Sequence, residues 1–186
     1  MRQSVFTPNQ LFDRFLTFCR YKKVYQVLDK MPHINTIYDM GCGSGNLVKA
    51  LRTKGFDAFG IDLRNGENII AADLNKPLPL ENNSVDVITS LANIEHLNEP
   101  LLNLQEIYRV LKDNGALVLT TPSTAAKPVL ECLAFKLKLI DPLEILDHKM
   151  YFSRKLLASY LAQAGFEKFK VTRFQCGMNL YAVAIK

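Results

Sequence analysis

Residues 37–46 read Ile-Tyr-Asp-Met-Gly-Cys-Gly-Ser-Gly-Asn, and this stretch decides the fold class. An apolar strand pattern over 34–40 runs into a cluster of glycines, and a helix pattern over 45–54 follows. Glycines let the backbone approach a ligand closely and adopt dihedral angles that are closed to other residues. Because open α/β sheets bind ligands at the carboxyl ends of their strands, this turn predicts a binding site.

Outward from this turn, strand and helix patterns alternate. The sequence predicts a helix over 9–31 that Pro32 closes, and a later helix that starts at Pro100 and ends at Gly115. Such alternation is typical of a largely parallel sheet with helices packed on both faces. The strands that follow the first are predicted at 56–62, 68–74, 85–91 and 116–122.

The C-terminal part predicts two more helices, over 126–139 and 153–164, and two more strands, over 166–174 and 179–186. Only four residues separate these strands, so we expect an antiparallel hairpin. The last strand is apolar on both faces and its partner carries several basic residues. We therefore expect the last strand to be inserted, antiparallel, between the fifth strand and the edge strand.

The spacing of the glycines separates the possible ligands. A dinucleotide fingerprint needs glycine or alanine at position 46, where this chain has Asn46, and no G-x-x-x-x-G-K-[ST] phosphate loop occurs. Asp39 would repel a pyrophosphate but suits a ligand with a cationic end, such as S-adenosylmethionine (SAM). Asp62 ends the second strand, where a carboxylate can accept hydrogen bonds from ribose hydroxyls. A nicotinamide-dependent oxidoreductase is therefore disfavoured.

With these residues, the chain resembles the class I SAM-dependent methyltransferases of the small-molecule, methyltransferase type 11-like group. That group includes enzymes of quinone biosynthesis and of glycan or lipid methylation. The likeness is close over 34–123 and looser elsewhere. It implies a Rossmann-like sheet of seven mostly parallel strands and SAM as cofactor. The cofactor-binding residues that it implies are Asp39, Gly41, Cys42, Gly43, Gly45, Asp62, Leu63, Asp73, Leu74, Ser90 and Leu91.

One departure from the family pattern lies between Asp62 and Asp73, where only ten residues intervene. A parallel crossover usually needs a dozen or more residues. We therefore expect a short or irregular third strand and a more open adenine side.

The size and composition of the chain predict one domain over 1–186, with a helical cap at 1–31 and a substrate lid at 122–152. The net charge of +5 divides into +4 for 1–30, −4 for 31–126 and +5 for 127–186. The four cysteines show no metal-ligand spacing, and we expect no metal site. With no visible targeting segment or long apolar run, we expect a cytoplasmic protein with at most a peripheral membrane contact.

The acceptor is left to the variable segments. We expect a methyl transferase acting on an oxygen of a lipid, quinone or sugar-type metabolite that is acidic or amphiphilic; the alternative is a non-catalytic SAM-binding regulatory or partner subunit. A nucleic-acid substrate is disfavoured, because residues 90–93 read Ser-Leu-Ala-Asn, without the N/D-P-P-Y/F tetrad that suits an exocyclic base amine.

The three histidines are the candidates for removing a proton from the acceptor. His33 precedes the first strand, away from the expected ligand edge. His96 follows the fourth strand, on the loop expected to face the transferred methyl group, and His148 lies in the segment expected to fold over the acceptor. The alternative is structural: His96 would cap or pack that loop, and His148 would hold the lid through a hydrogen bond. Histidine is well matched to accept a proton near neutral pH, and we predict catalytic roles for His96 and His148.

Overall fold

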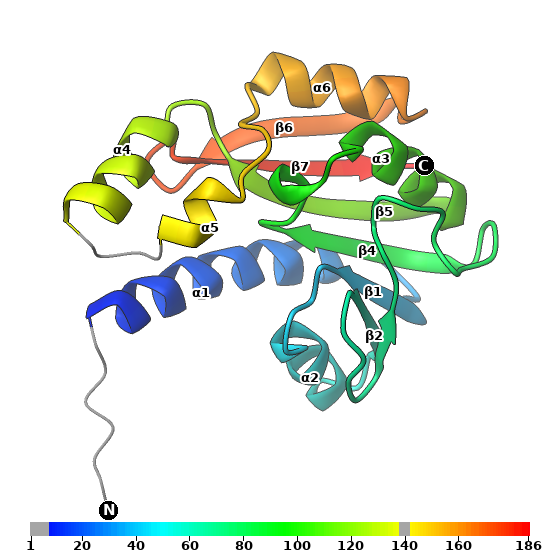
Figure 1. Ribbon diagram of the computed structural model, residues 1–186. Coiled ribbons are helices and arrows are strands. Elements are labelled where there is room, and N and C mark those ends of the chain that lie inside the picture. The colour runs from blue at the N-terminus through cyan, green and yellow to red at the C-terminus, as the bar shows by residue number, and fades with distance from the viewer. Residues whose placement is uncertain (1–7, 138–141) are drawn as a thin grey trace, which may run out of the picture.

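Seven strands form one sheet, drawn as arrows in Figure 1. The computed structural model describes residues 8–137 and 142–186. The strands are β1 Thr36–Met40, β2 Asp57–Asp62, β3 Ile69–Ala71, β4 Val85–Leu91, β5 Leu111–Pro122, β6 Lys168–Phe174 and β7 Asn179–Ile185. Their order is β3-β2-β1-β4-β5-β7-β6, parallel from β3 to β5 and antiparallel around β7. The predicted fold class and the inserted last strand are confirmed.

The position of β7 follows from its side chains. Leu180, Ala182 and Ala184 are buried on one face, while Tyr181 and Val183 pack against the core on the other. A strand that is apolar on both faces is stable only where helices cover both sides of the sheet. The β6 strand exposes Lys168, Lys170 and Arg173, as suits an edge.

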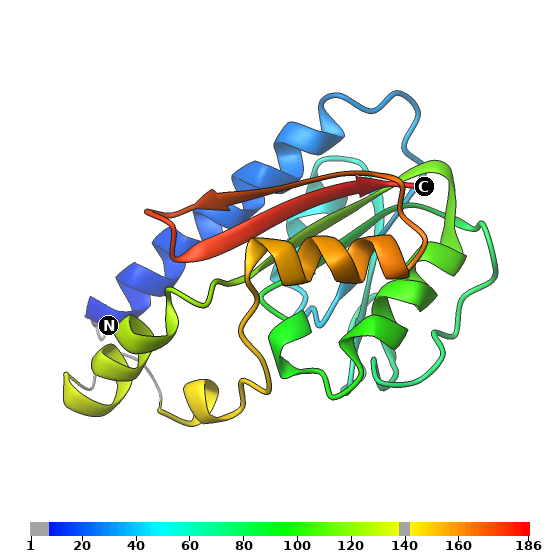
Figure 2. The same cartoon turned by 90° about the horizontal axis from the view of Figure 1, so that it is seen from above.

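Two layers of helices cover the sheet (Figures 1 and 2). Helices α1 Pro8–Leu28 and α2 Asn46–Thr53 lie on one face, and α3 Pro100–Val110 and α6 Arg154–Gln163 lie on the other. Each helix buries an apolar stripe, which for α2 consists of Leu47, Val48 and Leu51. Among the described residues, none of the helices is both long enough and apolar enough to cross a membrane.

The helix predicted to end at Gly115 ends earlier, at Val110, and β5 starts at Leu111. Leu111 already pairs with Val85 of β4, so a tertiary contact decides this boundary. Gly115 has a different role from the one expected. A Cβ there would lie 2.8 Å from the Lys112 carbonyl oxygen, so glycine is needed for close approach of the backbone.

The connection from β2 to β3 contains no helix. The β3 strand has only three residues and still pairs in parallel with β2. The prediction of a short third strand is therefore confirmed. Because no helix covers this edge, the loop that follows Asp62 lies at the surface beside the glycine turn.

Residues 123–137 and 142–152 follow the carboxyl end of β5, and their helices lie at the left of Figure 1. The single helix expected over 126–139 is instead α4 Lys127–Glu131, continued as a π-helix over Cys132–Lys136. A further helix, α5 Pro142–Leu146, follows. Residues 1–7 of the expected cap and 138–141 of the expected lid lie outside the described residues.

Candidate functional site

The glycine turn leaves β1 with a backbone that only glycine adopts readily. Gly41, Gly43 and Gly45 have φ angles of 67°, 52° and 72°. A Cβ on Gly41 would clash with the side chain of Asn93, which follows β4. A Cβ on Gly43 would meet nothing within 4 Å, so the turn is open to a ligand at that residue.

Asp62 lies across from this turn, at the carboxyl end of β2. The backbone N–H of Gly43 donates to Asp62 Oδ2 at 2.9 Å, so the carboxylate and the turn hold one another in place. Both line a surface cavity of about 670 Å³. Leu63, 75% exposed, lines the same cavity and offers an apolar surface to a bound ring. The structure thus brings Asp62 and Leu63 together with the glycines.

Asp39 is the buried acid of the site. Its carboxylate accepts a 2.6 Å hydrogen bond from the Thr89 hydroxyl of β4. Burial raises the pKa of Asp39 to about 7; the Thr89 hydrogen bond opposes this shift and the nearby charge of Asp62 adds to it. A cationic ligand would favour the ionised form, which burial penalises.

Because the pKa of Asp39 is about 7, we expect cofactor binding to depend on pH. If ionised Asp39 attracts the cationic end of SAM, affinity rises with pH through about 7, because below that pH binding must first remove a proton. Affinity at pH 6 should be about fivefold weaker than at pH 7. Calorimetric titrations over this range measure the effect. In Asp39→Asn the profile should flatten, and an equally steep profile in that variant would contradict the role.

The remaining candidate cofactor residues occupy different environments. Asp73 is part of a turn, where its carboxylate accepts hydrogen bonds from the backbone and side chain of Asn75, and these bonds lower its pKa. The Leu74 side chain lies in the core. Ser90 is buried, and Leu91 lines a second cavity described below.

Cys42 also has a packing role. Its sulfur lies against Gly60 of β2, where a Cβ would clash with it. Burial, with smaller effects from the charges of Asp39 and Asp62, raises the pKa of the Cys42 thiol to about 12. The thiol is therefore protonated near neutral pH, and the Cys42 side chain packs against Gly60 of β2.

The second cavity has a volume of about 1070 Å³ and begins where β4 ends. Helices α1, α4 and α5 and the β6–β7 hairpin supply its other walls. Most of the lining is apolar, which suits a small molecule with few polar groups. Apolar lining residues include Phe15, Leu16, Leu91, Pro122, Val129, Leu130, Leu133, Ile145, Phe174 and Met178.

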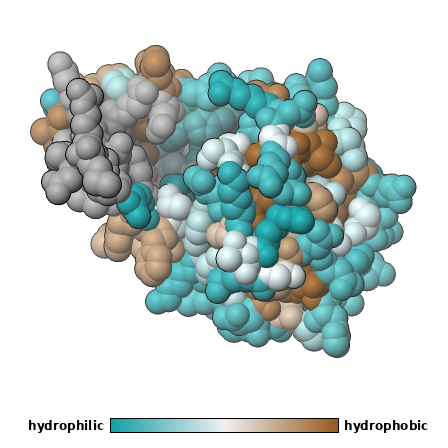
Figure 3. Space-filling model, turned by 90° about the horizontal axis from the view of Figure 1, so that it is seen from below, coloured by the Kyte–Doolittle hydropathy of each residue, from teal (hydrophilic) through white to brown (hydrophobic). Residues whose placement is uncertain are grey.

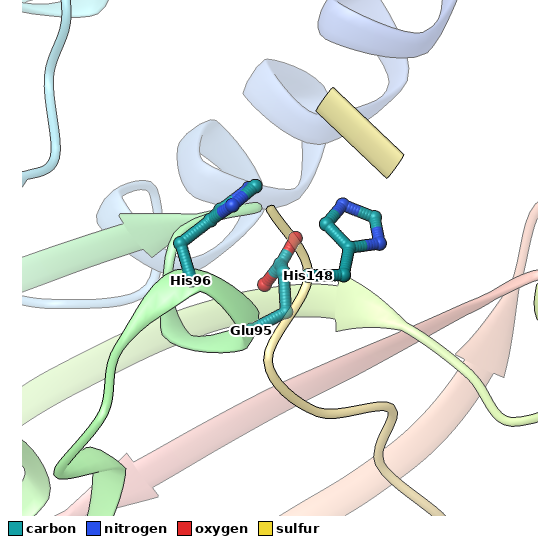
Figure 4. A group of neighbouring side chains, drawn as sticks. All are labelled: Glu95, His96 and His148. Atoms are coloured by element: carbon teal, nitrogen blue, oxygen red, sulfur yellow. The ribbon is translucent and has the colours of Figure 1, made fainter. Parts of the chain in front are cut away.

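Among the ionisable side chains that line this cavity, Glu95, His96 and His148 form one cluster (Figure 4). The rings of His96 and His148 lie 4.8 Å apart, centroid to centroid. Burial lowers the pKa of His148 to about 4; the charge of His96 adds to this shift and that of Asp147 opposes it. His148 is therefore neutral at physiological pH, and a pKa this low makes it a weak base there. The structure places both predicted catalytic histidines beside one another.

Glu95 is a member of this cluster that sequence reasoning missed. It is buried, and its carboxylate accepts a 2.9 Å hydrogen bond from the Thr121 hydroxyl. Burial raises its pKa, while several hydrogen bonds and positive charges, including that of Arg20, act in the opposite direction. The available signal was a glutamate next to His96, in the short segment that follows β4.

Asn93 and Thr89 were also missed. Both act on other site residues rather than through a recognisable motif: Asn93 packs against Gly41, and Thr89 donates to Asp39. Their roles depend on the pairing of β1 with β4, which brings the carboxyl ends of the two strands together. A short sequence motif does not contain this information.

Comparisons with known proteins identify the family of the chain. The family profile described as a methyltransferase domain matches residues 9–171. A protein of Psychrobacter arcticus named ubiquinone biosynthesis O-methyltransferase is 29% identical over 126 residues, covering 56% of this chain and 49% of that protein. Its namesake in Pseudomonas putida is 26% identical over 149 residues, covering 70% and 64%. The chain spans about half the length of several curated relatives that it matches.

Solved structures share the fold. A SAM-dependent methyltransferase of Archaeoglobus fulgidus superposes with a TM-score of 0.73 at 15% identity, over 97% of this chain and 100% of that one. A methyltransferase of Haloferax volcanii, solved in complex with the Trm112 methyltransferase activator, gives a TM-score of 0.68 at 17% identity, over 93% and 92%. From the family profile and this architecture, the chain belongs to the class I SAM-dependent methyltransferase family.

Proposed function

We propose that the protein transfers the methyl group of SAM to an oxygen atom of a small molecule bound in the second cavity. The observation that carries this proposal is the cavity itself. Its walls are mostly apolar, it begins at the end of β4, and it holds Glu95, His96 and His148 as its proton-handling groups. An acceptor hydroxyl there would lie beside groups able to take its proton.

The reaction needs little chemistry from the protein. The acceptor oxygen attacks the methyl carbon of SAM in line with the sulfur, and the carbon–sulfur bond breaks with its electron pair left on sulfur. S-adenosylhomocysteine is the other product. The protein mainly has to hold the reacting atoms in line and exclude water. The hydroxyl proton must also leave, and we propose that His96 accepts it while the neutral His148 ring packs against His96 and positions it.

The cofactor would lie over the glycine turn. We propose that Asp62 accepts hydrogen bonds from the ribose hydroxyls, that Leu63 packs on the adenine, and that Asp39 attracts the cationic end of SAM. Open space above Gly43 and the cavity of about 670 Å³ support this placement. Leu74 and Cys42, whose side chains pack inside the protein, would contribute through their backbone.

The acceptor is proposed to be a lipid, quinone or sugar-type metabolite with an apolar part. The apolar cavity lining supports this, as does the name of the ubiquinone biosynthesis relatives. Large apolar side chains are also exposed on the helical segments that wall the cavity, and hydrophobic residues appear at that end of the molecule in Figure 3. They would suit a peripheral membrane contact that delivers an amphiphilic acceptor. They are Phe15, Phe18, Val129, Phe135, Leu137, Leu143 and Leu146.

Turnover of methyl-labelled SAM with fractionated lipid, quinone and sugar metabolites tests the proposal. Label should move into one acceptor class, and mass spectrometry of the product should place it on oxygen. Binding of SAM with no transfer to any fraction would instead indicate a non-catalytic SAM-binding subunit.

Salt should slow the reaction if the acceptor is acidic. Arg20, Lys22 and Lys23 of α1 line the acceptor cavity, and both flanks of the sequence are basic. Exposed charges are screened over roughly 8–10 Å near physiological ionic strength, so kcat/KM for the acceptor should fall severalfold as salt is raised above that level. Steady-state rates at subsaturating acceptor measure this, and a salt-insensitive kcat/KM would count against an acidic acceptor.

A further inference from the structure

We infer that Glu95, His96 and His148 bind a divalent metal ion of the Zn²⁺ class in the wall of the acceptor cavity. One ligand atom from each lies within 4.8 Å of the others. In Figure 4 the Glu95 carboxylate lies between the two imidazole rings. The metal site itself stands independently of the proposed methyl transfer, but the role given to the ion rests on that function.

The donor set determines the class of ion. Two imidazole nitrogens and one carboxylate oxygen form the three-ligand set of catalytic zinc sites, which keep a further position open for water or substrate. Imidazole suits Zn²⁺ and its neighbours in the first transition row, whereas Mg²⁺ and Ca²⁺ prefer oxygen ligands. We therefore expect Zn²⁺ or Co²⁺ to bind and Mg²⁺ to bind weakly.

Hydrogen bonds already orient both rings. His96 Nδ1 lies 2.9 Å from Asp147 Oδ2, and His148 Nδ1 lies 3.0 Å from the Tyr151 hydroxyl. Each histidine would therefore ligate through Nε2. Metal-ligating histidines commonly use their other ring nitrogen in this way, because the bond fixes the tautomer and the orientation of the ring.

The backbone holds the two segments of the site together. The N–H groups of Lys149 and Met150 donate to the carbonyl oxygen of Glu95, at 2.8 Å and 3.3 Å. The buried Thr121 hydroxyl of β5 donates to the Glu95 carboxylate and orients it. Ligands far apart in sequence are thus brought together by contacts that do not need the ion, so ion binding requires only small side-chain movements.

The ion would act on the acceptor hydroxyl. Coordination in the open position lowers the pKa of a bound hydroxyl, as it does for metal-bound water. With the ion bound, the proton would pass to solvent rather than to His96 or His148, and the ion would favour the ionised acceptor oxygen that attacks the SAM methyl carbon as the carbon–sulfur electron pair returns to sulfur. Arg20 lines the same cavity and would favour an anionic acceptor.

Metal binding can be measured without any acceptor. Chelator-treated protein is titrated with Zn²⁺ by calorimetry and with Co²⁺ by visible absorption, which reports the coordination geometry. We expect one ion per chain, and at least about tenfold weaker Zn²⁺ binding in Glu95→Gln, His148→Ala and Asp147→Asn. His33→Asn, at an exposed histidine outside the cluster, should bind as the wild type does. Circular dichroism checks that each variant is folded.

The outcomes separate this inference from the proposed function. Equal Zn²⁺ affinity in the wild type, Glu95→Gln and Asp147→Asn would overturn the metal site, whether or not the protein methylates an acceptor. Loss of Zn²⁺ binding in these folded variants would establish it. Site-specific binding without methyl transfer to any acceptor would leave the metal site standing and refute the proposed function.

Discussion

His96→Ala should lower kcat by roughly 10²-fold or more while leaving SAM affinity nearly unchanged. His96 lines the acceptor cavity, and its ring is held by Asp147 and lies next to His148. It is not among the residues of the cavity beside Asp62, where the cofactor is proposed to bind. Loss of the imidazole should therefore affect proton removal rather than cofactor binding. Single-turnover rates at saturating acceptor, with calorimetry for SAM, measure the two effects separately.

The matched control is His33→Asn. His33 is exposed, with a φ of 57°, and asparagine tolerates that backbone better than alanine does. If kcat survives in His96→Ala and only acceptor binding suffers, the site works by proximity and orientation, and His96 loses its catalytic assignment. Chelator sensitivity of the wild-type rate then distinguishes the two roles of His96: a general base works without an ion, whereas a ligand does not.

Asp62→Ala should weaken SAM binding by more than ~1.4 kcal/mol, because the ribose hydroxyls lose a charged acceptor. The change also removes the bond from the Gly43 N–H, which helps to hold the glycine turn. Calorimetry with SAM and S-adenosylhomocysteine measures the loss. Both ligands contain the ribose, so both should be affected alike.

Asp57→Ala provides the control within the same strand. Asp57 lies at the opposite end of β2, where it forms an exposed ion pair with Arg52 at 3.2 Å. Exposed pairs contribute little to stability, so this variant should bind SAM as the wild type does. Unchanged affinity in Asp62→Ala would remove Asp62 from the cofactor site.

The sheet could be predicted from local sequence patterns, because each pattern reflects a local physical constraint. Glycines mark the turn after β1, a short link between Asp62 and Asp73 leaves room only for a short third strand, and apolar residues on both faces of β7 require burial on both sides. The boundary at Leu111 could not be predicted in this way. Residues 111–115 have the composition of a helix end, and only the pairing of Leu111 with Val85 of β4 shows that the strand starts there.

The candidate site likewise has a part that local sequence patterns predict and a part that depends on tertiary contacts. Asp39, Asp62 and the glycines are predictable because consecutive strand ends bring them to one edge. The grouping of Glu95 with His148 is not, because it depends on residues 147–151 returning to the end of β4 through backbone bonds to Glu95. No spacing in the sequence encodes that return, so the sequence indicated the two histidines but not their grouping with Glu95.

The placement of β7 has a consequence for synthesis of the protein on the ribosome. In the sheet order, β6 joins the other strands only through β7, yet β6 is made first. Until residues 179–185 have left the exit tunnel, β6 has no partner in the nascent chain and β5 presents an open hydrogen-bonding edge. Unpaired edges of this kind invite association with other chains. The five parallel strands can assemble during translation, but this edge is closed only after β7 emerges.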